Sequence, residues 1–544
     1  MASEAAFDYV IVGAGSAGCT LAARLSEDRD VRVLLLEAGG SDRDPWIRLP
    51  LGWGKILGKR LHDWMYFSQP EPRLNNREIE FARGKVIGGS SSVNAMTYIR
   101  GHRADYARWA AAGLSGWSYP EVLPYFRRQE TWEGGASAYR GGSGPLGVVT
   151  SRYDDPIVGA WLEASADAGF RHNDDHNGAD QEGVGRMQMT IRRGLRCSAA
   201  DAYLRPALRR SNLVLAQYAL ATRVLFQGDR AAGVAYRQGS ELAVARAERE
   251  VILCGGVVNS PQLLMLSGIG DPAALAPHGI AVRHALPGVG RNLQDHLSVG
   301  IEYVRSGRSL FTEQMRIDRI ARELGRAYAF GTGFATDLPS GWTAFLKSAA
   351  AGALPDTQIL FRAAPLGGKP YLEPFTRPVP DTYACRAVLV RPESRGWIEL
   401  ASADPDDLPR IHQNFLEREA DWRGIRAGLE LVRDLGRQKR LDGFRASERS
   451  NGLRTTAELD AHIRANAATA HHPAGTCRMG LAGDPMAVVD PELRVHGLER
   501  LRVVDASAMP DLVGGNINAV IIMMAERIAD RMRGRPALPP EDPA

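Results

Sequence analysis

The stretch from Phe7 to Glu37, FDYVIVGAGSAGCTLAARLSEDRDVRVLLLE, decides how this chain folds. Residues 7–12 are apolar and β-branched, which predicts a buried strand. Residues 19–26 carry apolar side chains at helical spacing, and residues 31–36 form a second apolar run. We therefore expect a strand, a glycine-rich turn, a helix and a second strand, which together make one βαβ unit.

The turn has the spacing GxGxxG at Gly13, Gly15 and Gly18. In such a turn the first glycine permits the tight bend, the second lets the backbone approach a pyrophosphate, and the third lets the helix pack against the strand. The helix N-terminus adds free N–H groups and a partial positive charge. Glu37 ends the second strand, where a carboxylate can accept hydrogen bonds from a ribose and would repel a 2′-phosphate. The pattern predicts a dinucleotide site and disfavours NADP; the alternative is a glycine-rich turn without a ligand.

Composition limits the remaining classes. The 544 residues allow about two to four domains. With 44% hydrophobic and 24% charged residues, most of the chain is neither disordered nor fibrous. The net charge of +4 is small and the charges are interspersed, so we expect no nucleic-acid partner.

The cysteines and the apolar runs bear on the compartment. The five cysteines are far apart and odd in number, which argues against a disulfide framework and favours a reducing compartment. No apolar run approaches about 18 residues, so we expect no membrane span. The segment 1–6 is too short and polar for a signal peptide. These features predict a cytoplasmic protein.

Further segments extend the nucleotide unit. Residues 84–100, GKVIGGSSSVNAMTYIR, contain a cluster of small residues that would allow close approach to a planar ligand or a diphosphate. Residues 212–237 resemble a small meander, and residues 250–254 are a buried strand. We expect Ser260 to cap the next helix, with Pro261 in its first turn.

The C-terminal third divides into two parts. Residues 301–465 alternate arginine-rich helical stretches with strand-like runs, which indicates a separate α/β layer for the substrate. Residues 501–504 form a buried strand, and a helix follows from about Asn516 to Met532. The proline-rich tail 535–544 is expected to be frayed. A nucleotide unit completed by the last residues implies a discontinuous domain.

Four segments together resemble the glucose–methanol–choline (GMC) family of FAD oxidoreductases, in its choline-dehydrogenase-like branch. They are FDYVIVGAGSAG…LLEAGG, GKVIGGSSSVNAMTYIRG, GGVVNSPQLLMLSGIG, and HHPAGTCRMG followed by VVDASAMPDLVGGNINAVIIMMAERIAD. They span nearly the whole chain in the family's order. Val257 stands where the family more often has a small residue.

The resemblance implies an α/β fold with a discontinuous Rossmann-like FAD-binding domain (1–155, 195–300 and 466–544). It also implies an α+β substrate domain, with a sheet covered by helices (156–194 and 301–465). Val93 occupies the position at which some relatives tether FAD through histidine, so we expect non-covalent FAD. The expected cofactor contacts are Gly13, Gly15, Ser16, Ala17, Gly18, Glu37, Ala38, Trp64, Val86, Gly89, Ser90, Asn94, Ala95, Met96, Val224, Asp505, Ala506, Ile517 and Asn518. Trp64 is as well suited to packing as to a flavin contact.

The resemblance also implies that His472, before Pro473, is the catalytic base and that Asn516 is its partner. The chemistry agrees, because alcohol oxidation is easier when a neutral imidazole takes the hydroxyl proton. Asn516 alone reads as a helix N-cap. The role of His471 stays open between the substrate cavity and a structural position.

The remaining predictions concern a candidate metal loop, the reaction and the competing functions. The loop from His172 to His176 has metal-ligand spacing, although a solvated turn fits it better. The expected reaction is oxidation of a primary alcohol, aryl or small aliphatic and choline-like, with O₂, a quinone or another carrier as acceptor. A redox-neutral lyase and a non-catalytic flavoprotein are the competing functions. The oligomeric state is not predicted.

Overall fold

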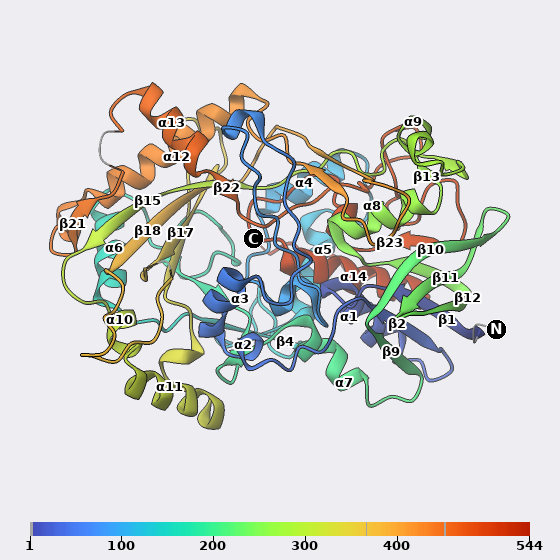
Figure 1. Ribbon diagram of the computed structural model, residues 1–544, viewed down its shortest axis with the longest axis horizontal. Coiled ribbons are helices and arrows are strands. Elements are labelled where there is room, and N and C mark those ends of the chain that lie inside the picture. Colours follow the sequence, from blue (N-terminus) through green and yellow to red (C-terminus); the bar gives the residue numbers. More distant parts are fainter. Residues whose placement is uncertain (1–3, 366, 451–452, 544) are drawn as a thin grey trace.

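Two seven-stranded sheets organise the molecule, one at each end of the long axis (Figure 1). The computed structural model describes residues 4–365, 367–450 and 453–543. The first sheet has the order β10-β11-β12-β1-β2-β9, with β23 also paired to β12, and lies at the N-terminal end of the view. The second has the order β21-β15-β18-β17-β16-β5, with β22 paired to β15.

The predicted βαβ unit is confirmed at the centre of the first sheet. β1 (Glu4–Val12) leads through Gly13–Gly15 into α1 (Ser16–Leu25), and β2 (Val33–Glu37) runs parallel to β1. β12 (Glu241–Leu253) pairs parallel with the other side of β1, and its end pairs with β23 (Leu501–Val503). The last strand predicted from the sequence therefore completes the N-terminal sheet.

The region expected to be one meander divides between two parts of this sheet. β9 (Leu213–Gln217) pairs parallel with β2 at the edge. β10 (Ala219–Gln227), β11 (Arg230–Gln238) and β12 form the antiparallel part. The sequence could not separate them, because both parts are short β-type runs with turns between them.

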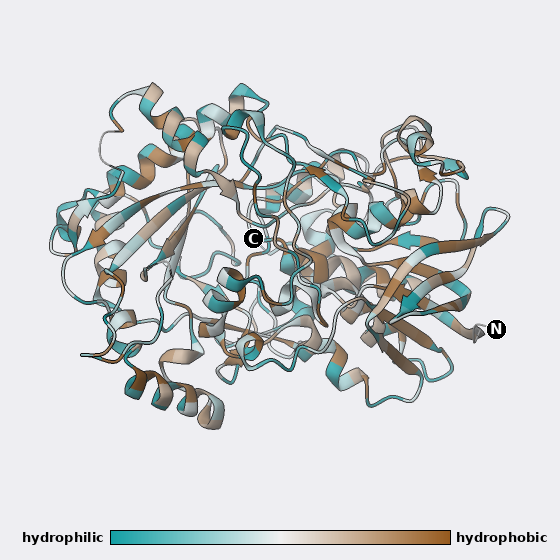
Figure 2. Ribbon diagram, viewed as in Figure 1, coloured by the Kyte–Doolittle hydropathy of each residue, from teal (hydrophilic) through white to brown (hydrophobic). Residues whose placement is uncertain are grey.

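The parallel strands are apolar at their carboxyl ends, residues 10–12, 33–36 and 251–253, because helices cover that part of the sheet (Figure 2). All five residues of β2 are buried. α14 (Asn518–Met532) packs against α1 and α5 (Tyr119–Gln129). The last long helix thus joins the core of the first strands.

The second sheet is antiparallel throughout its strands. They are β5 (Gly183–Arg186), β15 (Leu297–Arg305), β16 (Trp342–Leu346), β17 (Thr357–Arg362), β18 (Thr382–Leu389), β21 (Arg445–Glu448) and β22 (Ala468–Thr469). The helix predicted for 417–440 is α12 (Glu419–Gly436), which packs against β15 and β18. Side chains alternate along these strands. Val299, Ile359 and Ala387 face a core shared with α12, while Ser298, Leu360 and Arg386 line a cavity on the other face.

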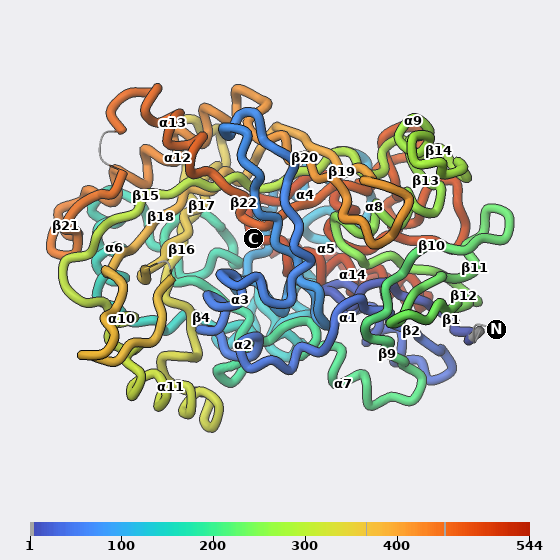
Figure 3. Tube along the Cα trace, in the orientation of Figure 1, coloured from blue at the N-terminus to red at the C-terminus, as the bar shows by residue number. Residues whose placement is uncertain are grey.

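The other elements cover the two sheets and connect them. The helices are α2 (Pro45–Arg48), α3 (Trp53–Lys59), α4 (Arg103–Ala111), α6 (Pro156–Asp167), α7 (Arg205–Ala207), α8 (Gly256–Leu266), α9 (Pro272–Leu275), α10 (Leu310–Gln314), α11 (Ile317–Phe330) and α13 (Thr456–Asn466). The strands are β3 (Glu130–Trp132), β4 (Leu146–Thr150), β6 (Gln188–Met189), β7 (Ile191–Arg192), β8 (Leu195–Arg196), β13 (Ile269–Gly270), β14 (His284–Ala285), β19 (Trp397–Glu399) and β20 (Arg410–His412). Figure 3 shows the segment with α2 and α3 running between the two ends.

The predicted cap at Ser260 is wrong. α8 begins at Gly256, so Pro261 lies inside it. Its missing N–H leaves the Val257 carbonyl without the usual helical partner, and the Thr476 hydroxyl donates to that carbonyl at 2.7 Å. A contact 219 residues away along the chain therefore makes the internal proline tolerable.

Two C-terminal expectations are also wrong. α14 begins at Asn518 with Ile517 as its N-cap, so Asn516 precedes the helix and does not cap it. The tail is held rather than frayed. The Glu541 N–H donates to the Pro120 carbonyl at 2.9 Å, and the Leu538 N–H donates to the Tyr125 hydroxyl at 3.1 Å.

The five cysteines are buried free thiols. In the described part of the chain, no helix is both long enough and apolar enough to cross a bilayer.

Candidate active site

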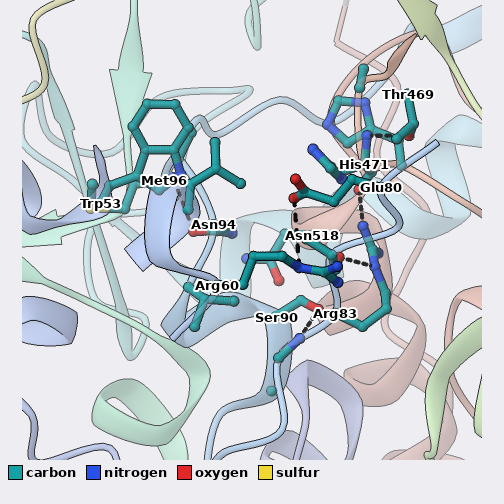
Figure 4. Close-up of a pocket in the computed structure, with 18 of the residues that line it drawn as sticks. Trp53, Arg60, Glu80, Arg83, Ser90, Asn94, Met96, Thr469, His471 and Asn518 are labelled. Atoms are coloured by element: carbon teal, nitrogen blue, oxygen red, sulfur yellow. Dashed lines mark hydrogen bonds and ion pairs between the residues drawn. The ribbon is translucent and has the colours of Figure 1, made fainter. Parts of the chain in front are cut away.

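One cavity of about 1660 Å³ lies between the two sheets. Figure 4 shows part of its wall, with Arg60, Glu80 and Arg83 near His471. Of the residues predicted from the sequence, it is lined by Gly13, Gly15, Ser16, Ala17, Glu37, Ala38, Trp64, Gly89, Ser90, Asn94, Ala95, Met96, His472, Asp505, Ala506, Asn516, Ile517 and Asn518. Segments from both ends of the chain therefore meet around one space.

Three predicted contacts do not line the cavity. A Cβ on Gly18 would stand 1.9 Å from the Gly13 carbonyl oxygen, so Gly18 allows α1 to pack on the turn. Val86 is fully buried against Ile47 and Ile56. Val224 is buried in β10, where its N–H donates to the Ser267 hydroxyl oxygen at 2.9 Å.

The glycines of the turn serve two different purposes. Gly13 has φ +100, and a Cβ there would stand 2.5 Å from the Cys254 carbonyl oxygen. A Cβ on Gly15 would meet nothing closer than 4.0 Å. Protein packing thus requires glycine at positions 13 and 18, whereas position 15 is left open toward the cavity.

Two helix N-termini converge here. The Ser16 hydroxyl at the start of α1 donates to the Asn518 Oδ1 at the start of α14, at 2.7 Å. Both helices direct their N-terminal ends to the cavity lining. The partial positive charges of two helix ends favour a negatively charged or electron-rich ligand between them.

Glu37 and Asp505 are the acids of this wall. Glu37 accepts from the N–H groups of Ala14 at 2.8 Å and Gly39 at 2.7 Å, and burial raises its pKa to about 7. Asp505 accepts from the Gly256 N–H and the Ser260 hydroxyl, and burial raises its pKa. Each carboxylate oxygen can accept a second hydrogen bond, so Glu37 can still take a ribose hydroxyl.

The GGSSS segment approaches the glycine turn closely. A Cβ on Gly89 would stand 2.8 Å from the Gly15 Cα. Asn94 accepts from the Met96 N–H at 2.9 Å and from the Arg196 guanidinium at 2.9 Å. Burial lowers the pKa of Arg196 to about 9. Arg196 was missed in the sequence, where one arginine among many carries no signal.

His472 and Asn516 meet on the cavity wall. The Asn516 Nδ2 donates to the His472 Nε2 at 2.8 Å, and the Gln358 Nε2 on β17 donates to the Asn516 Oδ1 at 3.1 Å. The Asn516 amide orientation is therefore defined from both sides. His472 is 8% exposed, so its only access is through the cavity.

Asn516 determines the tautomer of His472, and a second histidine accepts its proton in a hydrogen bond. The His472 Nδ1 lies 3.0 Å from the His296 Nδ1, and the two rings are nearly perpendicular. Because Nε2 of His472 accepts from Asn516, its proton is on Nδ1 and is donated to His296. This chain of donors leaves a lone pair on His472 Nε2, which faces the cavity.

The surroundings keep His472 neutral. Burial lowers its pKa well below the usual range, and His296, His471 and Arg83 act in the same direction. Burial likewise lowers the pKa of His296 to about 3 and that of His471 to about 3. A neutral imidazole with an unprotonated Nε2 is the form that can accept a proton.

Asp295 supports the backbone rather than the rings. It accepts from the His472 N–H at 2.9 Å and from the Thr469 hydroxyl, and burial raises its pKa to about 6. Thr469 in turn accepts from the His471 N–H at 2.7 Å, where His471 has φ 63. These bonds hold His471 in a left-handed conformation, and both His471 and His472 line the cavity.

His296, Gln358 and Asp295 were missed in the sequence. The one available signal was the acid–histidine pair Asp295-His296 directly before the strand β15. Gln358 lies inside an apolar strand, where nothing marks it. Their roles depend on the second sheet meeting the C-terminal segment.

The remaining candidates from the sequence are Trp64 and the loop from His172 to His176. Trp64 lines the cavity, stacks on Tyr66 at 5.8 Å and carries the Lys85 ammonium over its ring at 4.5 Å. His172 is exposed and bonds Asp174, whereas His176 is buried and bonds the Gln181 carbonyl. The described residues hold no group of three His, Cys, Asp or Glu side chains placed to share a metal ion.

The comparisons with known proteins agree with this geometry. Family models described as GMC oxidoreductase match residues 7–298 and 392–525. The chain belongs to the GMC oxidoreductase family. The mitochondrial choline dehydrogenase of Homo sapiens is 44% identical, over 98% of this chain and 90% of that protein. The oxygen-dependent choline dehydrogenase of Pseudomonas syringae is 43% identical, over 99% of this chain and 95% of that protein.

Solved structures share the whole fold. Pyridoxine 4-oxidase from Mesorbium loti matches with a TM-score of 0.87 and 33% identity, over 97% of this chain and all of that chain. Formate oxidase from Aspergillus oryzae matches with a TM-score of 0.89 and 26% identity, over 98% and 99%. The predicted α/β architecture of the GMC fold is thereby confirmed.

Proposed function

We propose that this GMC oxidoreductase oxidises a primary alcohol to the aldehyde with FAD. The observation that carries the proposal is the His472–Asn516 pair, 2.8 Å apart, on the wall of a cavity that also contains the glycine turn. The relatives and neighbours named above are dehydrogenases and oxidases. They favour oxidation, so the redox-neutral lyase is not proposed.

The residues present fit FAD. The turn leaves Gly15 open to the cavity, two helix N-termini line it, and its volume is large enough for a dinucleotide with room for a substrate. We propose that Gly13–Ala17, Glu37, Gly89 and Asp505–Ala506 hold the cofactor. FAD, when bound, supplies the acceptor for two electrons and the carbon-bound hydrogen. Formate oxidase, one of the structural neighbours, contains FAD that is modified.

Val93 lines the cavity and offers no nucleophile for a covalent link. We therefore propose non-covalent FAD, in the domain made of residues 1–155, 195–300 and 466–544. Acid precipitation should release the yellow chromophore to the supernatant. Colour that stays in the protein pellet would contradict this.

His472 and Asn516 divide the work on the alcohol. The His472 Nε2 lone pair accepts the hydroxyl proton, and the Asn516 Nδ2 donates to the same oxygen to hold it in place. His296 accepts the hydrogen bond from the Nδ1–H and so keeps Nε2 as the atom that takes the substrate proton, and proton removal of this kind contributes about 10²–10⁴-fold in rate. The substrate hydroxyl thus takes the place of the hydrogen bond between Asn516 Nδ2 and His472 Nε2.

The acceptor that reoxidises the flavin, O₂ or a quinone or another carrier, is left open in this proposal. Choline is the substrate named for the curated relatives. The location stays a prediction, because one of these relatives is mitochondrial. Residues 156–194 and 301–465 are proposed as the substrate domain.

The decisive experiment is anaerobic mixing of the yellow holoprotein with a panel of primary alcohols. Bleaching of the flavin spectrum, with an equal amount of aldehyde formed, supports the proposal. A spectrum that no alcohol changes would overturn it.

A further inference from the structure

The cavity that His472 lines has more basic than acidic side chains. In the described lining, seven side chains are basic and four are acidic. Arg386 projects from the middle of β18, on the same face of the sheet as Leu360 and Ala384. A charge at the centre of a sheet face needs a partner, because desolvation penalises it.

Arg386 forms hydrogen bonds, but it has no acidic side chain as an ion-pair partner among the described residues. Its Nη2 donates to the Ser298 hydroxyl at 2.7 Å and to the Ser298 carbonyl at 3.2 Å. Among the described residues, no carboxylate lies within ion-pair distance of it. Burial lowers its pKa to about 10 and the nearby Arg362 adds to this, so Arg386 stays charged at neutral pH.

The position of Arg386 is built into the strands. Gly300 of β15 pairs with Arg386 of β18. A Cβ on Gly300 would stand 2.8 Å from the Arg386 Cγ. Glycine at position 300 therefore leaves the space in which the arginine side chain lies. Leu360 stands directly opposite Arg386, so Gln358, two residues along the same face of β17, is a diagonal neighbour at about 7–8 Å.

This places the cation beside the reacting groups. Gln358 holds Asn516, and Asn516 holds His472. Ser298, the partner of Arg386, pairs with Ala468, which leads into the histidine pair. The positive charge of Arg386 also helps to lower the pKa of His471.

The acids of the cavity are already engaged. Glu302 pairs with Arg362 at 3.3 Å and with Arg449 at 2.8 Å. Glu80 faces Arg60 at 4.0 Å, as Figure 4 shows. Glu37 and Asp505 are held by backbone N–H groups on the cofactor side. Glu302, Glu37 and Asp505 are thus held by hydrogen bonds or ion pairs, while the Glu80 carboxylate makes no hydrogen bond within the described chain and has only Arg60 at ion-pair distance.

Two of the aromatic rings in the lining are already covered by cations. A quaternary ammonium group binds to open aromatic faces, but lysine ammonium groups already cover Trp46 at 3.7 Å and Trp64 at 4.5 Å. Arg83 is a second cation without an acid in ion-pair distance within the described chain, and it donates to the His471 carbonyl at 2.9 Å. Arg386 and Arg83 thus disfavour a positively charged substrate group beside them.

We propose that Arg386 binds an anionic group of the substrate, and that this protein oxidises an alcohol bearing a carboxylate in preference to choline. The inference rests on the proposed function and names its substrate class. The guanidinium presents its remaining N–H groups to a carboxylate. The exposed Lys55 and Lys59 of α3, at the same cavity, add a field that attracts an anion.

The test compares matched alcohols by anaerobic flavin reduction. One pair is para-(hydroxymethyl)benzoate and para-(hydroxymethyl)benzamide, which differ in charge and hardly in shape. The other pair is choline and its neutral analogue in which carbon replaces nitrogen. We expect the benzoate to be preferred over the benzamide by about 10- to 100-fold in kcat/KM, and the neutral analogue to be preferred over choline.

Variants assign the effect to Arg386. Arg386→Met should reduce the benzoate preference to near unity while the benzamide is oxidised at a similar rate, and Arg386→Lys should retain part of the preference. Arg362→Met is the matched control, because that cation lines the same cavity but is already paired with Glu302. FAD content and Tm establish that each variant is folded. The preference in the wild type should also decrease as salt is added.

The outcomes separate this inference from the proposed function. If choline reduces the flavin faster than its neutral analogue and the benzoate has no advantage, the anion site is wrong while alcohol oxidation stands. If Arg362→Met abolishes the preference and Arg386→Met does not, Arg386 is not the binding residue. If no alcohol of any charge reduces the flavin, the proposed function fails and this inference fails with it.

Discussion

The two walls of the cavity treat their charged groups differently. On the wall of the first sheet, the acids Glu37 and Asp505 accept hydrogen bonds from backbone N–H groups close in space. On the wall of the second sheet, Arg386 has no acid partner among the described residues and is bonded only to Ser298. A wall whose polar groups are satisfied locally is complete before any ligand binds. A wall with an unpaired charge can take its counter-charge from a ligand, as proposed for Arg386.

The largest effect is expected from the junction of the walls. His472→Ala removes the proton acceptor, so the rate of anaerobic flavin reduction by alcohol should fall by about 10²–10⁴-fold. FAD content should not change, because His472 lies away from the glycine turn. Rapid-mixing spectroscopy measures this rate. Near-normal reduction in the variant would remove His472 from the mechanism.

The next prediction separates packing from ligand contact on the first wall. Gly18→Ala places a Cβ against the Gly13 carbonyl and should lower the free energy of unfolding by about 1–3 kcal/mol. Gly15→Ala meets nothing within 4.0 Å, so the apoprotein should keep its stability and lose affinity for FAD. Thermal unfolding of both apoproteins and FAD titration test this pair. Equal destabilisation by the two changes would refute the distinction.

A smaller effect is expected at His296, which acts through His472. His296→Leu leaves the His472 Nδ1–H without an acceptor, so flavin reduction should slow by about tenfold. His296→Gln provides a carbonyl oxygen and should restore part of the rate. Because His296 helps to lower the pKa of His472, both variants should also shift the acid limb of the pH profile upward. A lower rate with an unchanged pH profile would indicate a structural role alone.

The smallest effect concerns pH in the wild type. The base must be neutral, and its pKa is lowered by burial and by neighbouring groups. The kcat/KM for a non-ionising alcohol should therefore stay level as pH falls through the ordinary histidine range near 6.5, and decline only below it. Measurement over that range decides it. A decline centred near 6.5 would show that His472 is not shielded.

Much of the fold and about half of the site were predictable. The βαβ unit, the GGSSS segment and the pair His472–Asn516 are encoded in contiguous motifs, because a tight turn or a histidine bend needs particular residues at adjacent positions. Ser260, the tail and the start of α14 were predicted wrongly. Each depends on a partner far along the chain, such as the Thr476 hydroxyl for the carbonyl before Pro261 or Tyr125 for Leu538.

By itself, the sequence predicted a fold built around a glycine-rich dinucleotide turn, and it marked a histidine and an asparagine as candidates for alcohol chemistry. Only the tertiary structure decided which groups tune that histidine. His296 and Gln358 come from a loop and a strand without local signals, and they contact His472 and Asn516 only because the second sheet forms one side of the cavity. The physical reason is range: backbone turns are governed by neighbouring residues, whereas the charge and the hydrogen bonds of a buried site are set by whatever the fold brings within a few ångströms.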